Sequence, residues 1–206
     1  MKKKNIIIIS IAAFVAILLI WGISTNNSLV TKDEAVKNAW GEVDNAYKRR
    51  ADLVKQLKTI VESAAKYEKG VLTEVTNARA GVESASDDVK QVKIDKSNPS
   101  NEQLMALEQA DKKLMKTIDN AIKVTVERYP ELTATQNFRD FQAQIEGSEN
   151  RISTARTNFN KAIQEYNTKT RRFPSSIIAG MFGFEQREYF DAPKEAEEPA
   201  DIEFNI

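Results

Sequence analysis

One unbroken apolar segment near the amino end restricts the fold of this chain more than any other feature of its sequence. Ile6 to Ile23 is a run of 18 residues in which Ser10 is the only polar member. A helix over this run would be about 27 Å long, because each helical residue rises about 1.5 Å, and this length is close to the hydrocarbon thickness of a bilayer. The sequence therefore predicts a single membrane-spanning helix.

The flanks of this segment favour an uncleaved anchor over a cleavable signal peptide, which remains the alternative. The run exceeds a typical signal-peptide core, and no clear A-x-A cleavage site follows it. Three lysines precede the run, whereas only Lys32 and Asp33 follow it closely, so we expect the amino end in the cytoplasm and the bulk of the chain on the extracytoplasmic side. We assign Ile6, Phe14, Leu19 and Trp21 to the anchor, with Trp21 at the membrane interface.

Beyond the anchor, the chain carries the pattern of long amphipathic helices. Seven Gly and five Pro among 206 residues leave few turns. From Val36 onward, apolar side chains recur in alternating steps of four and three, which places them on one face of a helix. Leu53 and Ile60 widen this face beyond the seam of a dimeric coiled coil, which favours a bundle. The apolar members of this stripe are Val36, Trp40, Val43, Tyr47, Val54, Leu57, Val61, Ala64, Val71, Val75, Ala78, Val82, Ala85, Val89 and Val92.

The first clear break in this pattern lies at 97–100. Pro99 disfavours helix at the residue before it. Ser100 and Gln103 have the spacing of a capping box, so we expect them to begin a second amphipathic stretch over 101–128.

A second break follows at Tyr129-Pro130. Thr133 and Gln136 have the same capping-box spacing, and we expect them to begin a further helix over 135–169. Phe173-Pro174 ends this helix.

The stretch 32–95 can be interpreted as one helix or as two. A single helix would be about 95 Å long, and two shorter helices folded back from its far end would leave the stripe from Val36 to Leu57 exposed. A break near 66–70 instead gives four antiparallel helices of comparable length, although Gly70 is the only helix-breaking residue there. We favour an all-α, up-down bundle of four long helices. The alternative has three long helices, the first of about 60 residues, and would need a second subunit to cover it, which makes a homo-oligomer possible.

Three parts follow from this organisation. Residues 1–27 are predicted to be the membrane anchor and linker, 28–190 the helical bundle, and 191–206 an acidic disordered tail. The bundle has almost no net charge, whereas nucleic-acid binding requires a concentrated basic surface. We therefore expect no nucleic acid partner.

The residue types present offer little catalytic chemistry. The chain has no His and no Cys, which excludes Ser-His-Asp and Cys-His catalysis, disulfides and the usual zinc or haem ligation. We expect no enzyme activity, no cofactor, no metal and no small-molecule substrate. Arg50 and Glu68 interrupt the apolar stripe, either as a buried pair or as a mark of where the stripe meets water. We favour the second interpretation, because long charged side chains can extend to solvent.

One short apolar segment is the candidate interaction surface. It follows Pro174 and precedes the acidic tail, and an up-down path of four helices would return it to the membrane-proximal side. There it could enter the lipid interface or contact a partner protein; the plainer interpretation is that it closes the open end of the bundle. Its apolar residues are Ile177, Ile178, Met181, Phe182, Phe184, Tyr189 and Phe190.

A set of dispersed motifs resembles the LemA family. In the first half they are Asn27-Ser28-Leu29-Val30, Asp33-Glu34-Ala35-Val36, Ala39-Trp40, Arg49-Arg50-Ala51-Asp52-Leu53, Tyr67-Glu68 and Thr76-Asn77-Ala78-Arg79-Ala80. In the second half they are Tyr129-Pro130-Glu131-Leu132, Asn137-Phe138, Glu149-Asn150-Arg151-Ile152, Ala155-Arg156, Tyr166-Asn167, Phe173-Pro174, Ile178 to Phe184 and Tyr189-Phe190. The resemblance covers about residues 27–192 and implies a membrane-anchored, all-helical bundle of bacterial type.

The resemblance implies no established enzymatic activity and carries no site residue to this chain. Some relatives are associated with membrane remodelling in magnetosome-forming bacteria. We expect a non-enzymatic scaffold or interaction module of the bacterial cell envelope, with unknown protein partners. The alternative is a signalling or sensory adaptor that couples an envelope partner to the membrane.

Overall fold

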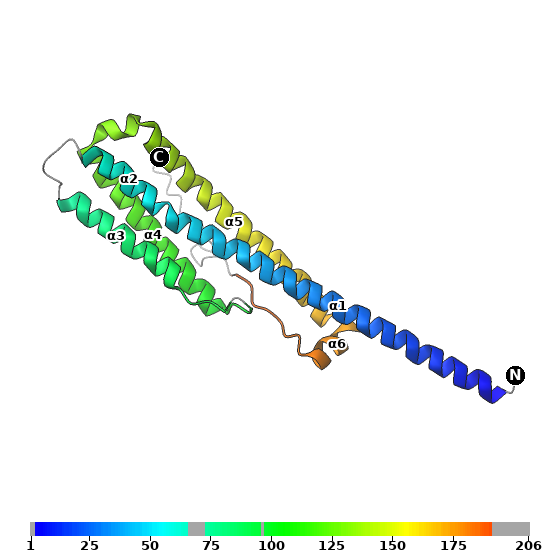
Figure 1. Cartoon of the computed structure of the whole chain (residues 1–206). Coiled ribbons are helices and arrows are strands. Elements are labelled where there is room, and N and C mark those ends of the chain that lie inside the picture. Colours follow the sequence, from blue (N-terminus) through cyan, green and yellow to red (C-terminus); the bar gives the residue numbers. More distant parts are fainter. Residues whose placement is uncertain (1–2, 66–72, 96, 191–206) are drawn as a thin grey trace, which may run out of the picture.

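The chain folds entirely into helices and connecting segments over the residues that the computed structural model describes, which are 3–65, 73–95 and 97–190 (Figure 1). This confirms the all-α prediction. The elements are α1 (Lys3–Asp52), α2 (Val54–Ala65), α3 (Thr73–Gln91), α4 (Asn101–Arg128), the 3₁₀ helix η1 (Pro130–Ala134), α5 (Gln136–Arg171) and α6 (Ser175–Phe182).

Four antiparallel rods form the bundle, as the favoured interpretation predicts. Figure 1 shows α1 and α2 running away from the anchor, α3 returning, α4 running out again and α5 returning. The main packing partners are α1 with α5 and α3 with α4, and α3 also contacts α1 and α2. Since two halves of one straight helix cannot pack against each other, these contacts exclude a single rod over 32–95. The expected break at 66–70 lies outside the described residues.

The anchor and the first bundle helix are one continuous helix. α1 covers 50 residues, about 75 Å, and passes the expected boundary at 27/28 without interruption. Its apolar segment projects beyond the bundle, and the most apolar window is wholly unburied, which is what a lipid-facing helix requires (Figure 1). Leu53 alone separates α1 from α2, where its N–H bonds to the carbonyl of Arg50 at 3.1 Å.

The predicted apolar stripes meet in the core. Trp40 is 2% exposed, and its ring lies 5.7 Å from that of Phe159 on α5. Such close packing of large rings accounts for much of the hydrophobic stabilisation of a small bundle. Other fully buried core side chains are Val36, Val43, Leu57, Val82, Leu104, Leu114, Ile118, Phe138, Phe141 and Ile163.

The helix starts were predicted correctly at one break and wrongly at the other. Ser100 accepts from the N–H of Gln103, and the Gln103 side chain accepts from the N–H of Ser100, so the capping box of α4 is confirmed. α5 is capped by Thr135, which accepts from the N–H of Phe138. Thr133 is not the cap, because Pro130 begins a 3₁₀ helix that includes it.

Candidate functional site: the membrane-proximal end of the bundle

The predicted interaction segment returns to the anchor, because α5 ends beside α1. α6 packs against both helices. Its Ile178 faces α1, where Cδ1 would lie 3.7 Å from a Cβ atom built on Gly22. This is an ordinary van der Waals distance, so α6 lies directly beside the anchor at Gly22. Gly183, with a φ of 72°, ends the helix in the left-handed conformation that glycine adopts without strain.

The segment divides into an exposed helix and a packed strap. On and beside α6, four large apolar side chains are more than half exposed, and we call Phe173, Ile177, Met181 and Phe182 the α6 surface. The following residues 184–190 form an extended strap along the bundle, in which Phe190 is 4% exposed and Phe184 packs against the core. Phe190 is therefore covered and Phe184 is only partly exposed, whereas Tyr189 is 42% exposed.

Two asparagines on α5 hold the strap through its backbone. The Asn167 side chain donates to the Arg187 carbonyl at 2.8 Å and accepts from the Arg187 N–H at 2.9 Å. Asn160 forms the same pair of bonds with the backbone of Phe190, both at 2.8 Å. Each amide thus satisfies a backbone donor and acceptor that would otherwise lack partners next to the core.

Charged contacts tie this strap to other parts of the bundle. The Arg187 guanidinium binds the carboxylate of Asp33 on α1 and the carbonyl of Ser97 before α4. Burial alone would raise the pKa of Asp33, but hydrogen bonds from Lys37 and Arg187 hold it below its ordinary value. The strap thereby joins the α1·α5 pair to the α3·α4 pair.

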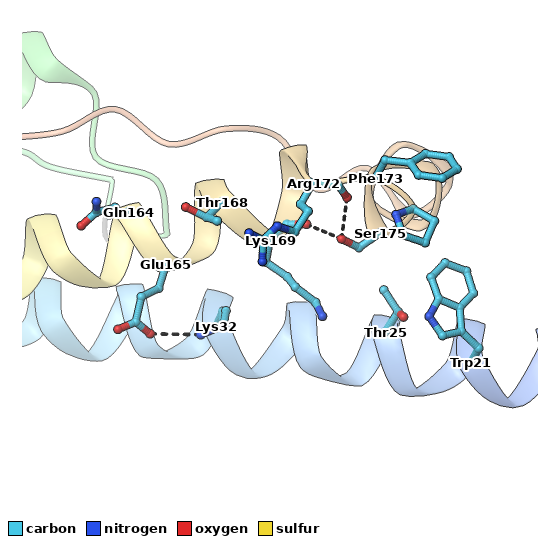
Figure 2. A pocket seen from close by; sticks show the side chains of 11 residues that line it. Trp21, Thr25, Lys32, Gln164, Glu165, Thr168, Lys169, Arg172, Phe173 and Ser175 are labelled. Carbon is cyan, nitrogen blue, oxygen red and sulfur yellow. Dashed lines mark hydrogen bonds and ion pairs between the residues drawn. The ribbon is translucent and has the colours of Figure 1, made fainter.

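A groove of about 450 Å³ lies between α1 and the end of α5, and we call it the membrane-proximal groove (Figure 2). Its α1 wall consists of Trp21, Thr25 and Lys32, and its α5 wall of Gln164, Glu165, Thr168 and Lys169. Arg172, which caps α5, and the following Phe173, Pro174 and Ser175 form its end. The end nearest the anchor is aromatic and apolar, and the opposite end is polar and charged (Figure 2). The groove is therefore amphipathic along the direction of α1.

Polar contacts within this groove leave two cations free. Lys32 binds Glu165 at 3.0 Å and lowers the pKa of that carboxyl. The Ser175 hydroxyl donates to the carbonyls of Lys169 and Arg172, both at 2.7 Å. Within the part of the chain that the structure describes, the side chains of Lys169 and Arg172 form no hydrogen bond or ion pair.

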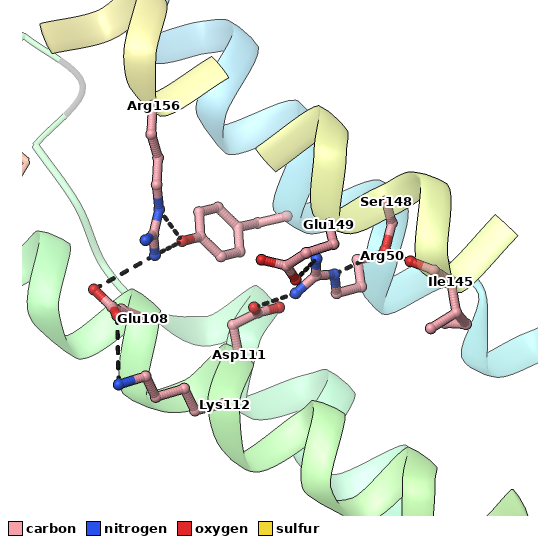
Figure 3. Close-up of polar contacts among 9 residues, drawn as sticks. Arg50, Glu108, Asp111, Lys112, Ile145, Ser148, Glu149 and Arg156 are labelled. Carbon is pink, nitrogen blue, oxygen red and sulfur yellow. Dashed lines mark hydrogen bonds and ion pairs between the residues drawn. The ribbon is translucent and has the colours of Figure 1, made fainter. Parts of the chain in front are cut away.

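A second polar cluster lies in the middle of the bundle, where the sequence analysis expected a contact with water. Arg50 is 1% exposed and joins three helices (Figure 3). Its guanidinium binds Asp111 of α4 at 2.5 Å, Glu149 of α5 at 2.6 Å and the Ser148 hydroxyl at 2.9 Å. The interpretation of Arg50 as a boundary residue is therefore wrong, because its charge is neutralised inside the core. Glu68 lies outside the described residues.

Burial dominates the electrostatics of this cluster. It raises the pKa of Asp111 to about 6, against the opposing effect of Arg50, and Oδ1 of Asp111 has no hydrogen-bond partner. One signal in the sequence could have revealed the cluster. Asp111 falls between Leu107 and Leu114, in the same four-then-three spacing as the apolar stripe of α4.

A neighbouring set of contacts extends the cluster toward the strap. Arg156 donates to the Tyr47 hydroxyl and lies 3.4 Å from Glu108 (Figure 3). Its guanidinium also lies 4.2 Å from the ring centre of Phe190. Burial raises the pKa of Tyr47 to about 12 despite the nearby guanidinium. Among the described residues no group of three or more His, Cys, Asp or Glu could hold a metal ion.

The comparison with known families identifies the bundle. A model of the LemA family matches residues 39–204. The chain belongs to the LemA family. The match includes the Arg50 cluster, the strap and α6, and it begins beyond the apolar segment of α1.

Two relatives of this LemA chain come from one magnetotactic species. They are Magnetosome protein MamQ 1 and Magnetosome protein MamQ 2 of Paramagnetospirillum magneticum. Each is 25% identical over 202 residues, which cover 93% of this chain and 72% of the relative. The similarity thus covers most of this chain and nearly three quarters of each relative.

Proposed function

We propose that this LemA protein is a non-enzymatic scaffold or interaction module of the bacterial cell envelope. The observation that carries the proposal is the α6 surface, where four large apolar side chains lie exposed beside the end of the anchor. The chain lacks His and Cys, and its buried charges pair with one another, which leaves few groups for catalysis. These features favour a protein that acts by binding a membrane or a partner protein over one that catalyses a reaction.

The α6 surface would meet the lipid interface. With Ile6–Ile23 across the hydrocarbon, Gly22 lies close to the boundary of the bilayer, and Ile178 of α6 packs beside Gly22. Fully burying one such large apolar side chain contributes about 1.5–3 kcal/mol, so partial insertion of four would fix the bundle against the membrane by several kcal/mol.

Fluorescence labelling of the full-length chain in liposomes tests this contact. The chain has no Cys, so Phe182→Cys provides a single attachment site for an environment-sensitive fluorophore. We expect blue-shifted emission and quenching by spin-labelled lipids. The matched control is Glu131→Cys at the far end of the bundle, where the fluorophore should emit as it does in water. Water-like emission at both positions would contradict insertion of the α6 surface.

We also propose that the bundle lies on the extracytoplasmic side. The three lysines before the apolar segment support this orientation. A membrane-impermeant maleimide should label Glu131→Cys in intact spheroplasts, and the mature protein should still begin at its original amino end. Labelling only after lysis would place the bundle in the cytoplasm, and an amino end near Thr25 would mean that the anchor is cleaved.

A signalling or sensory adaptor is the second candidate, and the continuity of α1 favours it. One helix connects the membrane segment to Arg50 in the core, so a displacement of the anchor would reach the bundle directly. Affinity capture of the full-length protein from crosslinked membranes separates the two candidates. Recovery of a kinase or protease would support the adaptor, and recovery of structural envelope proteins would support the scaffold.

A further inference from the structure

We propose that the membrane-proximal groove binds the phosphate-bearing headgroup of an anionic lipid in the surrounding bilayer. This inference rests on the proposed function in one respect, because it requires α1 to span the membrane. It concerns a different set of side chains from the α6 surface. The α6 surface supplies apolar contact, whereas the groove would select lipids by charge.

The height of the groove relative to the bilayer supports this ligand. Trp21 occupies the membrane end of the groove, where an indole marks the boundary of the hydrocarbon. Thr25 lies one helical turn further, about 6 Å along the axis, and the headgroup layer is about 5–7 Å thick. Figure 2 shows the Lys169 side chain extending from α5 toward α1 beside Thr25. Its ammonium group therefore reaches the level of the lipid phosphates.

The distribution of charge within the groove also fits an anion at this level. Lys32 lies 11 residues beyond Trp21, about 16 Å along α1, where it neutralises Glu165. Closer to the membrane, Lys169 in the last turn of α5 and Arg172 at its C-cap are three residues apart and remain unpaired within the described chain. Two adjacent cations with no carboxylate partner form a suitable site for a phosphate.

The end of α5 would ordinarily repel an anion, because its free carbonyls carry partial negative charge. Here the Ser175 hydroxyl caps the carbonyls of Lys169 and Arg172, and the Ser176 N–H donates to the carbonyl of Arg172 at 3.0 Å. This capping lowers the repulsion at the helix end. The apolar end of the groove, formed by Trp21, Phe173 and Pro174, points along the anchor and could accept the start of an acyl chain.

Native mass spectrometry of the full-length protein in detergent micelles tests the proposal. Phosphatidylglycerol and phosphatidylcholine with identical acyl chains are added in equal amounts. We expect the wild-type protein to retain phosphatidylglycerol with at least about tenfold preference, and the Lys169→Gln/Arg172→Gln variant to lose this preference. The single variant Arg172→Gln, at an exposed position, provides the same test if the double variant does not fold.

Matched controls distinguish this site from general charge and from the α6 surface. Lys116→Gln/Lys123→Gln removes two exposed cations from α4 and should leave the lipid preference unchanged. Phe182→Ser should also leave it unchanged, and Lys169→Gln/Arg172→Gln should not alter the emission of the label at position 182 in phosphatidylcholine. The two proposals can therefore fail separately.

Three outcomes would overturn the inference. The wild-type protein could bind both lipids equally. The double variant could melt at a lower temperature and keep its lipid preference, in which case the two cations only complement the dipole of α5. Inorganic phosphate at millimolar concentration could displace the lipid completely, which would assign the site to free phosphate.

Discussion

The middle of the bundle and its membrane-proximal end depart from the usual distribution of side chains in opposite ways. In the middle, Arg50 is 1% exposed and is bound by Asp111 and Glu149. At the membrane-proximal end, Phe173 and Met181 are 76% and 74% exposed. Charge is thus buried in one region and apolar surface is exposed in the other.

This difference indicates what each region contributes. A buried ion pair is expensive to desolvate, so the Arg50 cluster is better suited to fixing how α1, α4 and α5 meet than to adding stability. Exposed apolar surface lowers solubility in water, so the α6 surface is better suited to contact with lipid or protein. Substitutions in the first region should change unfolding, and substitutions in the second should change binding.

The largest effect on stability is expected from the aromatic core beside the Arg50 cluster. Trp40→Ala should lower the free energy of unfolding by about 3–5 kcal/mol, because it leaves a large cavity next to Phe159. Chemical denaturation of the full-length protein in micelles, followed by circular dichroism, measures the change. A loss below about 1 kcal/mol would mean that the stripe faces something other than its own core.

Removing the central guanidinium should have a similar or slightly smaller effect. Arg50→Met keeps an unbranched apolar side chain of similar reach to the aliphatic part of arginine but leaves Asp111 buried without its counter-charge, which costs about 3–5 kcal/mol for a broken buried pair. The loss should shrink below pH 6, where Asp111 is protonated. Lys37→Met, which removes a partly exposed i,i+4 pair with Asp33, is the control and should cost about 1 kcal/mol or less.

The pH dependence of unfolding isolates Asp111. Its pKa is raised to about 6 in the folded chain, so between about pH 4 and 6 the folded state binds more protons than the unfolded state. The contribution of this group to stability is therefore present at pH 4 and is lost as the pH rises to 6. Asp111→Asn should remove that dependence, which makes the variant more stable relative to wild type at pH 7 than at pH 4 by about 2–3 kcal/mol. A difference independent of pH would mean that Asp111 keeps an ordinary pKa.

The smallest effect on stability is expected at the α6 surface. Phe182→Ser should change the free energy of unfolding by less than about 0.5 kcal/mol, because the side chain is 61% exposed. Its buried counterpart Phe138→Ala should cost about 3–5 kcal/mol in the same measurement. A large loss of stability from Phe182→Ser would mean that Phe182 is a core residue and that the two regions do not differ in this way.

The helices and their order were predictable because each depends on local information. The apolar stripe from Val36 is a periodic signal, and Pro99 and Pro130 mark breaks that the backbone must obey. The choice between Thr133 and Thr135 as the cap of α5 was less predictable. Both residues can cap, and the 3₁₀ turn begun by Pro130 selects the later one.

The site was predictable only in part. An apolar segment after Pro174 was expected to return toward the anchor, and α6 does so. Its division into an exposed helix and a packed strap depends on Asn160 and Asn167, which are ordinary polar residues in the sequence. Their role arises only when the strap lies across α5.

The sequence by itself determined the long apolar segment near the amino end, the helical class and the breaks at Pro99 and Pro130, because hydrophobic length, helical periodicity and proline act within a few residues of the chain. Only the tertiary structure decided that Arg50 is buried, that Phe190 is covered, and that Lys169 and Arg172 line a groove with Trp21 of the anchor. The pairing of Arg50 with Asp111 and Glu149 spans 61 and 99 residues. A charged side chain prefers solvent unless partners in the core neutralise it, and only folding brings those partners together from distant parts of the chain.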